Sequence, residues 1–284
     1  MSNRSILISA DSTCDLPAEL LQKHGIATLP LYVIHEGQAF KDGVDLTPDE
    51  LYAKVKSSGK LGSTAAINVD EYLTFFTAQR EKCDTLIHFV ISSEMSSCYQ
   101  NACIAAGEVG GVYVIDSRNL SCGMALAMLR ACELAEQGMA AEVIVSAARE
   151  LLGRVDTSFI PDSLEYLKLG GRCSAAAALG ANLLRIKPCI QVKEGVMTLG
   201  KKYTGSLESV LMKYVGDRLR DVNSVDLSRV FIVHSGLSNP AIVDKVTDAI
   251  LAIAPFEEVL FSRAGCTISS HCGPNTLGFA FCRK

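Results

Sequence analysis

The stretch Thr85–Ala102 reads TLIHFVISSEMSSCYQNA and decides how the first half of the chain folds. Its apolar run, Thr85–Ile91, is typical of a strand buried on both faces of a parallel sheet. A helical pattern begins at Met95, so the stretch predicts a strand, a turn and a helix. Four serines crowd this turn, and they could cap the helix, supply a nucleophile or bind an anion.

The same alternation of strand and helix extends over the first 155 residues. The other predicted strands are also apolar and lie at Ser5–Ala10, Ala27–His35 and Val112–Ile115. The predicted helices lie near Asp15 and Pro17 and at Leu46–Lys56, Val69–Glu81, Met95–Gly107, Gly123–Glu136 and Glu142–Leu152. This order predicts a parallel sheet covered on both faces, with its ligand beyond the carboxyl ends of the strands.

The second half of the chain has a different pattern. Residues 186–205 predict two strands around a Glu194–Gly195 turn, which is a hairpin signal and brings in antiparallel pairing. The segment SLEYLKLGGRCSAAAALGANLL (163–184) predicts a helix, a Gly-Gly stop and a helix of small residues. The other predicted strands and helices lie at Ser158–Pro161, Ser206–Arg218, Val230–His234, Pro240–Ile253, Glu258–Ser262 and Gly278–Phe281.

We therefore predict an α/β protein of two domains. Residues 1–155 form an α/β domain with a parallel sheet flanked by helices, and residues 156–284 form an α/β domain with a mixed or antiparallel sheet. The boundary lies in the turn at Gly153–Asp156. It is approximate, and the domains need not be continuous in sequence.

Composition excludes several classes of protein. The chain has 284 residues, 49% of them apolar, and a net charge of −4, which argues against a nucleic-acid-binding protein. No apolar run is long enough for a membrane span and the first residues lack a secretory signal, so we expect a cytoplasmic protein. The 11 cysteines contain no C-x-x-C pair, which favours buried reduced thiols over a zinc or redox site.

No common catalytic or cofactor motif is present. The chain lacks G-x-x-x-x-G-K-[ST], G-x-G-x-x-G, G-x-S-x-G and H-E-x-x-H, so we predict no metal site and no nucleotide cofactor. A serine nucleophile needs a base and an orienting acid, and no histidine lies close in sequence to the serine-rich turn.

Four other stretches carry polar groups where a site could form. Asp11, Ser12 and Thr13 follow the first strand, where they could cap a helix or line the ligand crevice. Ser63 and Thr64 lie in a predicted loop before the helix cap Asn68. Arg172 follows a Gly-Gly pair and is either a solvated side chain or a contact for a partner or phosphate, and His271 lies between hydroxyls and a Gly-Pro turn.

Together these stretches resemble the DegV family over the length of the chain. The matching segments are ISADSTCDLP (8–17), STAAIN (63–68), ISSEMSSCYQNA (91–102), YLKLGGRCS (166–174) and SHCGPNTLGF (270–279). Each segment alone is a weak signal, but five in the right order and spacing are specific.

The resemblance implies a protein that binds one long-chain fatty acid, such as palmitate or stearate, between two domains. It implies a non-catalytic subunit that presents the acid to a separate ATP-dependent fatty-acid kinase, which forms the acyl phosphate. If the family pattern is carried over to this chain, Thr64 and Ser93 contact the carboxylate. Ser63, Ser92 and the backbone near Ser96 then lie beside them. His271 would approach the headgroup from the second domain, and Arg172 would face the kinase. We expect a monomer or weak dimer.

The chain departs from the family pattern in several places. Ala65 and Ala66 replace a serine and a glutamine, Ser97-Cys98 replaces Gly-Thr or Gly-Ser, and Asn275 replaces a glycine. Many relatives carry an arginine after the hairpin, where this chain has Lys202-Tyr203-Thr204; Lys201 or Lys202 could substitute as a flexible charge.

Two alternative functions stay open at this point. One is a hydrolase or acyl transferase that uses Ser93 or Ser96 with His271 as base. The other is a binding module for a different amphipathic carboxylate. In the fatty-acid hypothesis, Ser93→Ala should weaken lipid retention and leave the fold intact.

Overall fold

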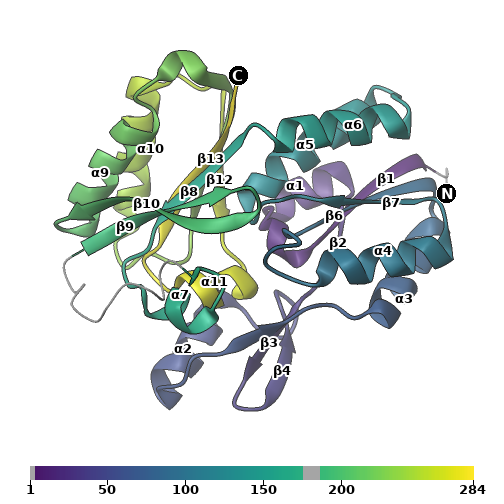
Figure 1. Ribbon diagram of the computed structural model, residues 1–284, viewed down its shortest axis with the longest axis horizontal. Helices are drawn as coiled ribbons and strands as arrows, with labels where there is room; N and C mark the ends of the chain where they lie inside the picture. The colour runs from purple at the N-terminus through teal and green to yellow at the C-terminus, as the bar shows by residue number, and fades with distance from the viewer. Residues whose placement is uncertain (1–3, 175–185) are drawn as a thin grey trace.

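The architecture is that of an α/β protein with two large sheets, seen in a computed structural model that describes residues 4–174 and 186–284 (Figure 1). The first sheet has the strand order β2-β1-β6-β7 and all its pairs are parallel. Its strands are β1 (Arg4–Asp11), β2 (Ala27–Leu29), β6 (Cys83–Val90) and β7 (Val112–Asp116). The predicted parallel sheet is confirmed, because apolar strands joined by helices pair in this way.

Helices cover both faces of the first sheet (Figure 1). One layer holds α3 (Val69–Arg80) and α4 (Cys98–Val109), and the other holds α5 (Cys122–Glu136) and α6 (Ala141–Leu152). The short α1 (Ala18–His24) links β1 to β2. As predicted, Asn68 caps α3, by accepting a hydrogen bond from the Glu71 amide.

The second sheet is mixed and has the order β10-β9-β8-β13-β11-β12. Its strands are β8 (Val155–Ile160), β9 (Ile186–Lys193), β10 (Val196–Thr204), β11 (Val225–His234), β12 (Glu258–Arg263) and β13 (Leu277–Arg283). Only β11 and β12 pair in parallel. The predicted hairpin is confirmed: Glu194 and Gly195 both have positive φ, as a two-residue turn of this kind requires.

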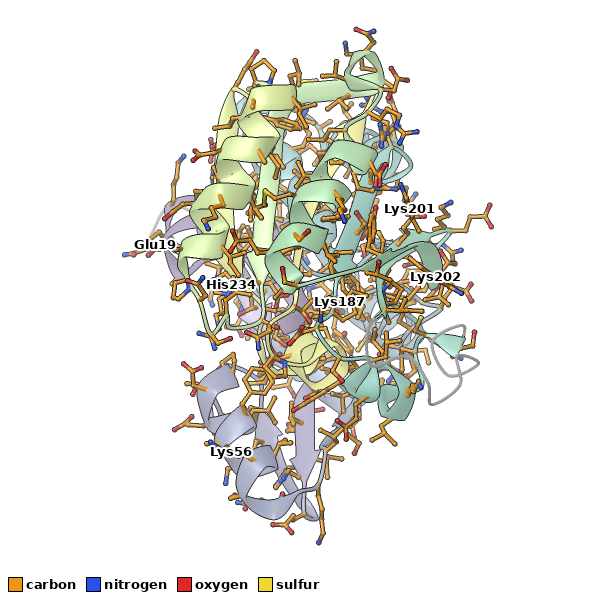
Figure 2. The ribbon with its side chains drawn as sticks, turned by 90° about the vertical axis from the view of Figure 1, so that its left-hand side faces the viewer. Glu19, Lys56, Lys187, Lys201, Lys202 and His234 are labelled. Atoms are coloured by element: carbon orange, nitrogen blue, oxygen red, sulfur yellow. The ribbon has the colours of Figure 1, made fainter. Side chains whose placement is uncertain are left out.

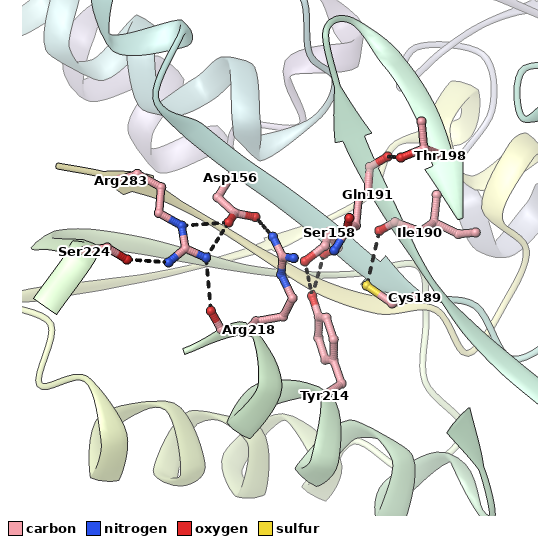
Figure 3. Close-up of polar contacts among 10 residues, drawn as sticks. All are labelled: Asp156, Ser158, Cys189, Ile190, Gln191, Thr198, Tyr214, Arg218, Ser224 and Arg283. Atoms are coloured by element: carbon pink, nitrogen blue, oxygen red, sulfur yellow. Dashed lines mark hydrogen bonds and ion pairs between the residues drawn. The ribbon is translucent and has the colours of Figure 1, made fainter. Parts of the chain in front are cut away.

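The outer face of the second sheet packs against α9 (Leu207–Arg218) and α10 (Ala241–Ile253), which enclose a core of their own. Polar groups of β8 also face this side. Asp156 pairs with Arg218 and Arg283, and the Ser158 hydroxyl lies 2.8 Å from the Tyr214 hydroxyl (Figure 3). Burial lowers the pKa of Arg218 to about 10. Because this value is still well above neutral pH, the guanidinium stays charged there.

Helix α5 lies between the two large sheets. It contacts β1 and β6 of the first sheet and β8, β11 and β13 of the second. Most of its side chains are buried, including Met124, Leu126 and Met128. A helix that is apolar all round is buried all round, so the sequence of α5 suits a position between two sheets.

The structure corrects two expectations about the segments between β1 and α3. The predicted strand Ala27–His35 is two strands, because Pro30 lacks an amide hydrogen and separates β2 from β3 (Tyr32–His35). Strand β3 pairs with β4 (Gln38–Lys41) and β5 (Ser63–Ala65) in a third, antiparallel sheet next to α2 (Pro48–Ser58). Thr64 therefore lies on a strand instead of in a loop.

The sequence analysis also missed helix α11 (Cys266–Cys272). It packs against the short α7 (Glu165–Gly170), which precedes the Gly-Gly stop. The predicted helix of small residues after that stop falls on residues 175–185, which lie outside the described part of the chain.

The first large sheet uses strands between residues 4 and 116, and the second uses strands between 155 and 283. The domain boundary near residue 155 stays a prediction. No helix within the described ranges is long and apolar enough to cross a membrane.

Candidate functional site

A cavity of about 180 Å³ is lined by strands of the second and third sheets and by segments that follow strands of the first sheet. Residues from β5, the turn before α4, the start of α5, β8, β10, β11, α11 and β13 line it. Most of the lining is apolar, including Leu31, Ile91, Met95, Leu120, Phe159 and Met197. The turn after β6 reaches the cavity because it follows the carboxyl end of a parallel strand, where ligands of such sheets bind.

Several polar residues are among those that line the cavity, including Thr64, Ser96, Arg172 and His271. The Thr64 hydroxyl lies 2.9 Å from Nε2 of His271. Strand β5 supplies Thr64 and helix α11 supplies His271, so two elements missed in the sequence carry this pair.

The imidazole of His271 is largely buried and neutral at neutral pH. Burial, and next the positive charge of Arg172, lower the pKa of His271 to about 4. Its Nδ1 has no hydrogen-bond partner among the described residues. Gly170 presses against this edge of the ring, since a Cβ at Gly170 would lie 2.2 Å from Nδ1. A neutral imidazole can donate one hydrogen bond to a ligand oxygen without a fixed charge.

Two buried carboxylates hold the start of α11. The Asp42 carboxylate accepts hydrogen bonds from the amides of Cys266 (2.6 Å) and Thr267 (3.1 Å). The Asp15 carboxylate accepts one from the Gly265 amide (2.8 Å), and burial raises the pKa of Asp15 well above its usual value. Asp15 lies close to the predicted start of the first helix but does not cap it: its carboxylate holds α11, and Pro17 stands at the start of α1 with no capping hydrogen bond.

The D-S-T segment at the end of β1 links several elements by hydrogen bonds. The Asp11 carboxylate accepts hydrogen bonds from the amides of Ile91 (2.8 Å) and Thr13 (3.0 Å). Ser12 donates to Asp42 (3.1 Å). Burial raises the pKa of Asp11 to about 6.

The serines of the opening stretch have separate positions. The Ser92 hydroxyl is buried and donates to the Gly195 carbonyl (2.7 Å), which links the end of β6 to the hairpin of the second sheet. Ser93 is exposed, and its hydroxyl accepts a long hydrogen bond from Arg118 (3.4 Å). Neither side chain lines the cavity.

Ser96 and Ser97 do line the cavity. The Ser96 hydroxyl accepts a hydrogen bond from the Cys98 amide (3.3 Å) at the start of α4 and lies 3.2 Å from the Cys98 sulfur. For carboxylate binding, the family pattern implies a role only for the backbone near Ser96; the Ser96 hydroxyl enters only in the hydrolase alternative. Its position two residues before Cys98, the first residue of α4, was the available signal, because the unpaired amides at the start of a helix need nearby acceptors.

Two further predicted site residues lie at the edge of this arrangement. Ser63 is exposed and does not line the cavity. Arg172 is exposed at the cavity, and its guanidinium donates to the Gly170 carbonyl (2.9 Å). No carboxylate among the described residues pairs with it.

The lysines considered as substitutes for an arginine lie elsewhere. Lys201 pairs with Asp217 (2.6 Å), and neither Lys201 nor Lys202 lines the cavity. Figure 2 shows both on the opposite side of the view from His234, a cavity residue.

The described residues do not assemble a serine–histidine–acid arrangement around His271. His271 has Thr64 as its hydrogen-bond partner, so neither Ser93 nor Ser96 is hydrogen-bonded to it. A catalytic histidine also needs an acid behind its second nitrogen, and Nδ1 has none among the described residues. Within the described ranges, no group of histidines, cysteines and acids could hold a metal ion.

Comparison with known proteins extends the similarity over the whole chain. A family model described as "Uncharacterised protein, DegV family" matches residues 5–284. A solved structure described as "Fatty Acid Binding of a DegV family Protein from Thermus thermophilus" has a TM-score of 0.90 and 30% identity, covering 98% of this chain and 99% of that chain.

Two other relatives are similar over nearly their full length. A stearic acid-binding protein from Eubacterium ventriosum has a TM-score of 0.85 and 26% identity, covering 98% of both chains. A Thermotoga maritima protein named fatty acid-binding protein is 26% identical over 282 residues, which is 96% of each chain. The similarity therefore includes all elements that line the cavity.

Proposed function

The chain belongs to the DegV family, and on this premise we propose that it binds one long-chain fatty acid in the cavity between its sheets. The observation that carries the proposal is a mostly apolar cavity whose wall contains the hydrogen-bonded pair Thr64 and His271. Relatives described as fatty-acid-binding proteins share the fold over the full length of this chain.

A carboxylate and an acyl chain need two kinds of surroundings. A buried carboxylate must be hydrogen-bonded or paired, since the free-energy cost of burying it alone is several kcal/mol. Burying the acyl chain contributes roughly 0.8 kcal/mol per methylene. The hydroxyls of Thr64 and Ser96 and the neutral imidazole of His271 are candidate donors to the carboxylate, and Arg172 adds a positive charge at the exposed side.

The carboxylate-binding set remains a proposal. It comprises Thr64, Ser93, Ser63, Ser92 and His271, as the family pattern implies, and Ser96 joins it because this residue lines the cavity. The positions of Thr64, Ser96 and His271 in the cavity wall support their assignment to this set directly. Ser92 supports the site indirectly, through its hydrogen bond to Gly195.

We further propose that the protein presents its fatty acid to a separate ATP-dependent kinase and has no catalytic role. Arg172 is exposed, and Leu169 one turn before it is 69% exposed, so this corner could contact a partner protein. The cytoplasm is the proposed location and a monomer or weak dimer the proposed state. This step is tested by mixing the lipid-loaded protein with ATP and a fatty-acid kinase and measuring acyl phosphate. We expect acyl phosphate to form, and its absence would contradict the proposed step.

Lipid identification is the direct test of binding. We expect organic extraction of freshly purified protein, followed by mass spectrometry, to yield about one fatty acid per chain. Native mass spectrometry should show the same mass difference before extraction. Protein that carries no fatty acid, and takes none up after delipidation and incubation with palmitate or stearate, would exclude the proposed function.

A further inference from the structure

Two side chains at the edge of the first sheet hold the tip of the β9–β10 hairpin. The Ser92 hydroxyl donates to the Gly195 carbonyl (2.7 Å), and the Arg118 guanidinium donates to the Glu194 carbonyl. Ser92 follows β6 and Arg118 follows β7, which are neighbours in the first sheet. Figure 1 shows the hairpin reaching from the second sheet toward the first. We call these two hydrogen bonds the clasp.

Both sides of the clasp are preformed. Arg118 has a left-handed backbone (φ 47°), which is uncommon for a residue other than glycine and needs support from its surroundings. Its amide donates to the Asp116 carboxylate (2.9 Å), and its guanidinium pairs with Glu94 (2.9 Å). On the hairpin side the turn requires glycine, since a Cβ at Gly195 would lie 2.7 Å from the Ser92 hydroxyl.

The other end of the hairpin is fixed separately. Lys201 and the Tyr203 hydroxyl both bind the Asp217 carboxylate of α9 (2.6 and 3.0 Å). Between this base and the tip, the ladder of β9 and β10 has a register shift between Leu199 and Lys202. A bulge of this kind disrupts the ladder and bends the strand, so it forms a hinge between the base and the tip.

The tip segment, residues 191–199, forms part of the cavity wall. Met197 lines the cavity. Together with Val192 it is buried in an apolar cluster that also contains Ile91 and Met95, from the turn after β6. The described ladder between β8 and β9 has two residue pairs, against seven between β9 and β10. The tip is therefore held mainly by the clasp and by apolar contacts.

The clasp is weak enough to open. The Arg118 side chain is 42% exposed and that of Glu94 is 49% exposed, and exposed ion pairs add little to stability. The Ser92 hydroxyl is buried, but one neutral hydrogen bond changes an equilibrium by only about two- to tenfold. Contacts of this strength suit an element that opens and closes.

We propose that the tip of the β9–β10 hairpin is a flap over the cavity, that Arg118 and Ser92 hold it shut, and that its opening sets the rate at which the fatty acid enters and leaves. Arg118 is a positioning residue in this role, because it acts through the hairpin and does not line the cavity. The inference rests on the proposed function, since it concerns how the same cavity is loaded.

The test compares the lipid exchange of wild-type protein and Arg118→Ala. Release of a fluorescent fatty acid is measured after mixing the loaded protein with excess palmitate, and uptake is measured with delipidated protein. We expect both rates to rise by about three- to tenfold in Arg118→Ala, the effect of one lost hydrogen bond in the clasp. The dissociation constant should change by less than about twofold, because a flap that opens more often speeds entry and release alike.

Hydrogen exchange of the delipidated proteins measures the opening without a ligand. Amides of the tip segment should exchange about three- to tenfold faster in Arg118→Ala, whereas those of β11 and β13 should keep their rates. Glu94→Gln removes only the ion pair of Arg118, so its effect should be smaller and should disappear at high salt.

Lys245→Ala is the matched control. Its ion pair with Glu208 is similarly exposed (53% and 41%) but joins α10 to α9, on the outer face of the second sheet. Lipid exchange and the exchange of the tip amides should stay as in the wild type. If Lys245→Ala speeds both as much as Arg118→Ala does, the effect is a general loss of stability and the inference is overturned.

The outcomes separate this inference from the proposed function. Equal release and uptake rates in wild type and Arg118→Ala overturn the inference and leave fatty-acid binding in place. Faster release with unchanged uptake also overturns it, because the variant then weakens only the bound state. Failure of the wild-type protein to bind any fatty acid overturns both.

Discussion

Thr64 and His271 are separated by 207 residues, yet their side chains are 2.9 Å apart. Nothing in the local sequence around Thr64 or His271 indicates that the two side chains form a pair. What makes them a pair is the burial of the imidazole, which keeps it neutral, and the close approach of Gly170. At the scale of single residues, the site depends on neutral donors with one charged group, Arg172, at its exposed side.

The serine-rich turn allows a direct test of residue assignment. We expect Ser96→Ala to weaken fatty-acid binding by about tenfold, the loss of one hydrogen bond to a charged group. Ser93→Ala should have a smaller effect, because the Ser93 hydroxyl lies beside Arg118 and outside the cavity. Displacement titrations of both variants measure this, and a larger loss in Ser93→Ala would restore the assignment that the family pattern implies.

A second residue-scale prediction concerns His88 on β6. Its ring is enclosed by Tyr72, Phe75 and Phe76 and lies 2.8 Å from the Ser9 hydroxyl. Burial lowers the pKa of His88 to about 3. Between pH 3 and the unfolded-state pKa of about 6.5, the unfolded chain binds a proton that the folded chain does not. Stability from this residue is therefore present above that range and is lost as pH falls.

We expect the free energy of unfolding to fall by roughly 2 kcal/mol between pH 7 and pH 5 on account of His88 alone. His88→Asn keeps a group able to bond Ser9 and removes the titration, so its fall should be smaller by about that amount. Urea unfolding of both proteins at the two pH values measures the difference. Asp11, whose pKa is raised to about 6, acts in the opposite direction in both proteins and cancels in the comparison. Equal falls in the two proteins would refute the prediction.

At the scale of elements, the cavity depends on pieces too short to be stable alone. Strand β5 has three residues and α11 has seven. Isolated helices of that length are not stable in water, and the serines, cysteines and threonine of α11 are weak helix formers. The carboxylates of Asp42 and Asp15 supply the missing acceptors for the first amides of α11. The helix therefore exists because of residues more than 200 positions earlier in the chain.

Asp42→Ala tests this dependence. We expect it to lower the free energy of unfolding by about 2–3 kcal/mol, since two buried amides of α11 and the Ser12 hydroxyl lose a charged acceptor. It should also weaken fatty-acid binding, because α11 carries His271.

Ser206→Ala is the matched control. It removes the cap of α9, whose hydroxyl accepts from the Ser209 amide, on the far side of the second sheet from the cavity. It should cost about 1 kcal/mol of stability and leave the lipid affinity as it is. If both variants change lipid affinity equally, α11 has no special link to the site.

At the scale of the whole molecule, helix α5 and the cavity share the space between the two large sheets. The first turn of α5 lines the cavity, and the rest of the helix fills the core that joins the sheets. A ligand in the cavity would contact the turn after β6 and the start of α5 as well as strands of the second sheet, and so would stabilise their arrangement. Binding and global stability should therefore be linked.

Thermal unfolding measures this link. At a free fatty-acid concentration 100 times the dissociation constant, the folded state should gain roughly 2.7 kcal/mol. For a chain of this size that corresponds to a rise in Tm of about 5–10 °C over delipidated protein. Calorimetry of delipidated and reloaded protein provides the comparison. An unchanged Tm after verified reloading would show that the lipid does not bridge the sheets.

Local pattern predicted the regular part of this fold. The apolar strands, the amphipathic helices, the Glu194–Gly195 hairpin and the Asn68 cap are all confirmed, because each depends on residues within one or two turns of one another. The third sheet and α11 were missed, since their stability comes from contacts distant in sequence.

The sequence by itself determined the fold class, the family and the segments that surround the site. Only the tertiary structure decided which residues within those segments line one cavity: Ser96 instead of Ser93, and Thr64 beside His271. The reason is geometric. A motif fixes which segment follows the end of a strand, but the direction of each hydroxyl depends on one-residue differences in where the turn or helix begins. Those differences are set by long-range partners such as Asp42, Gly170 and Gly195.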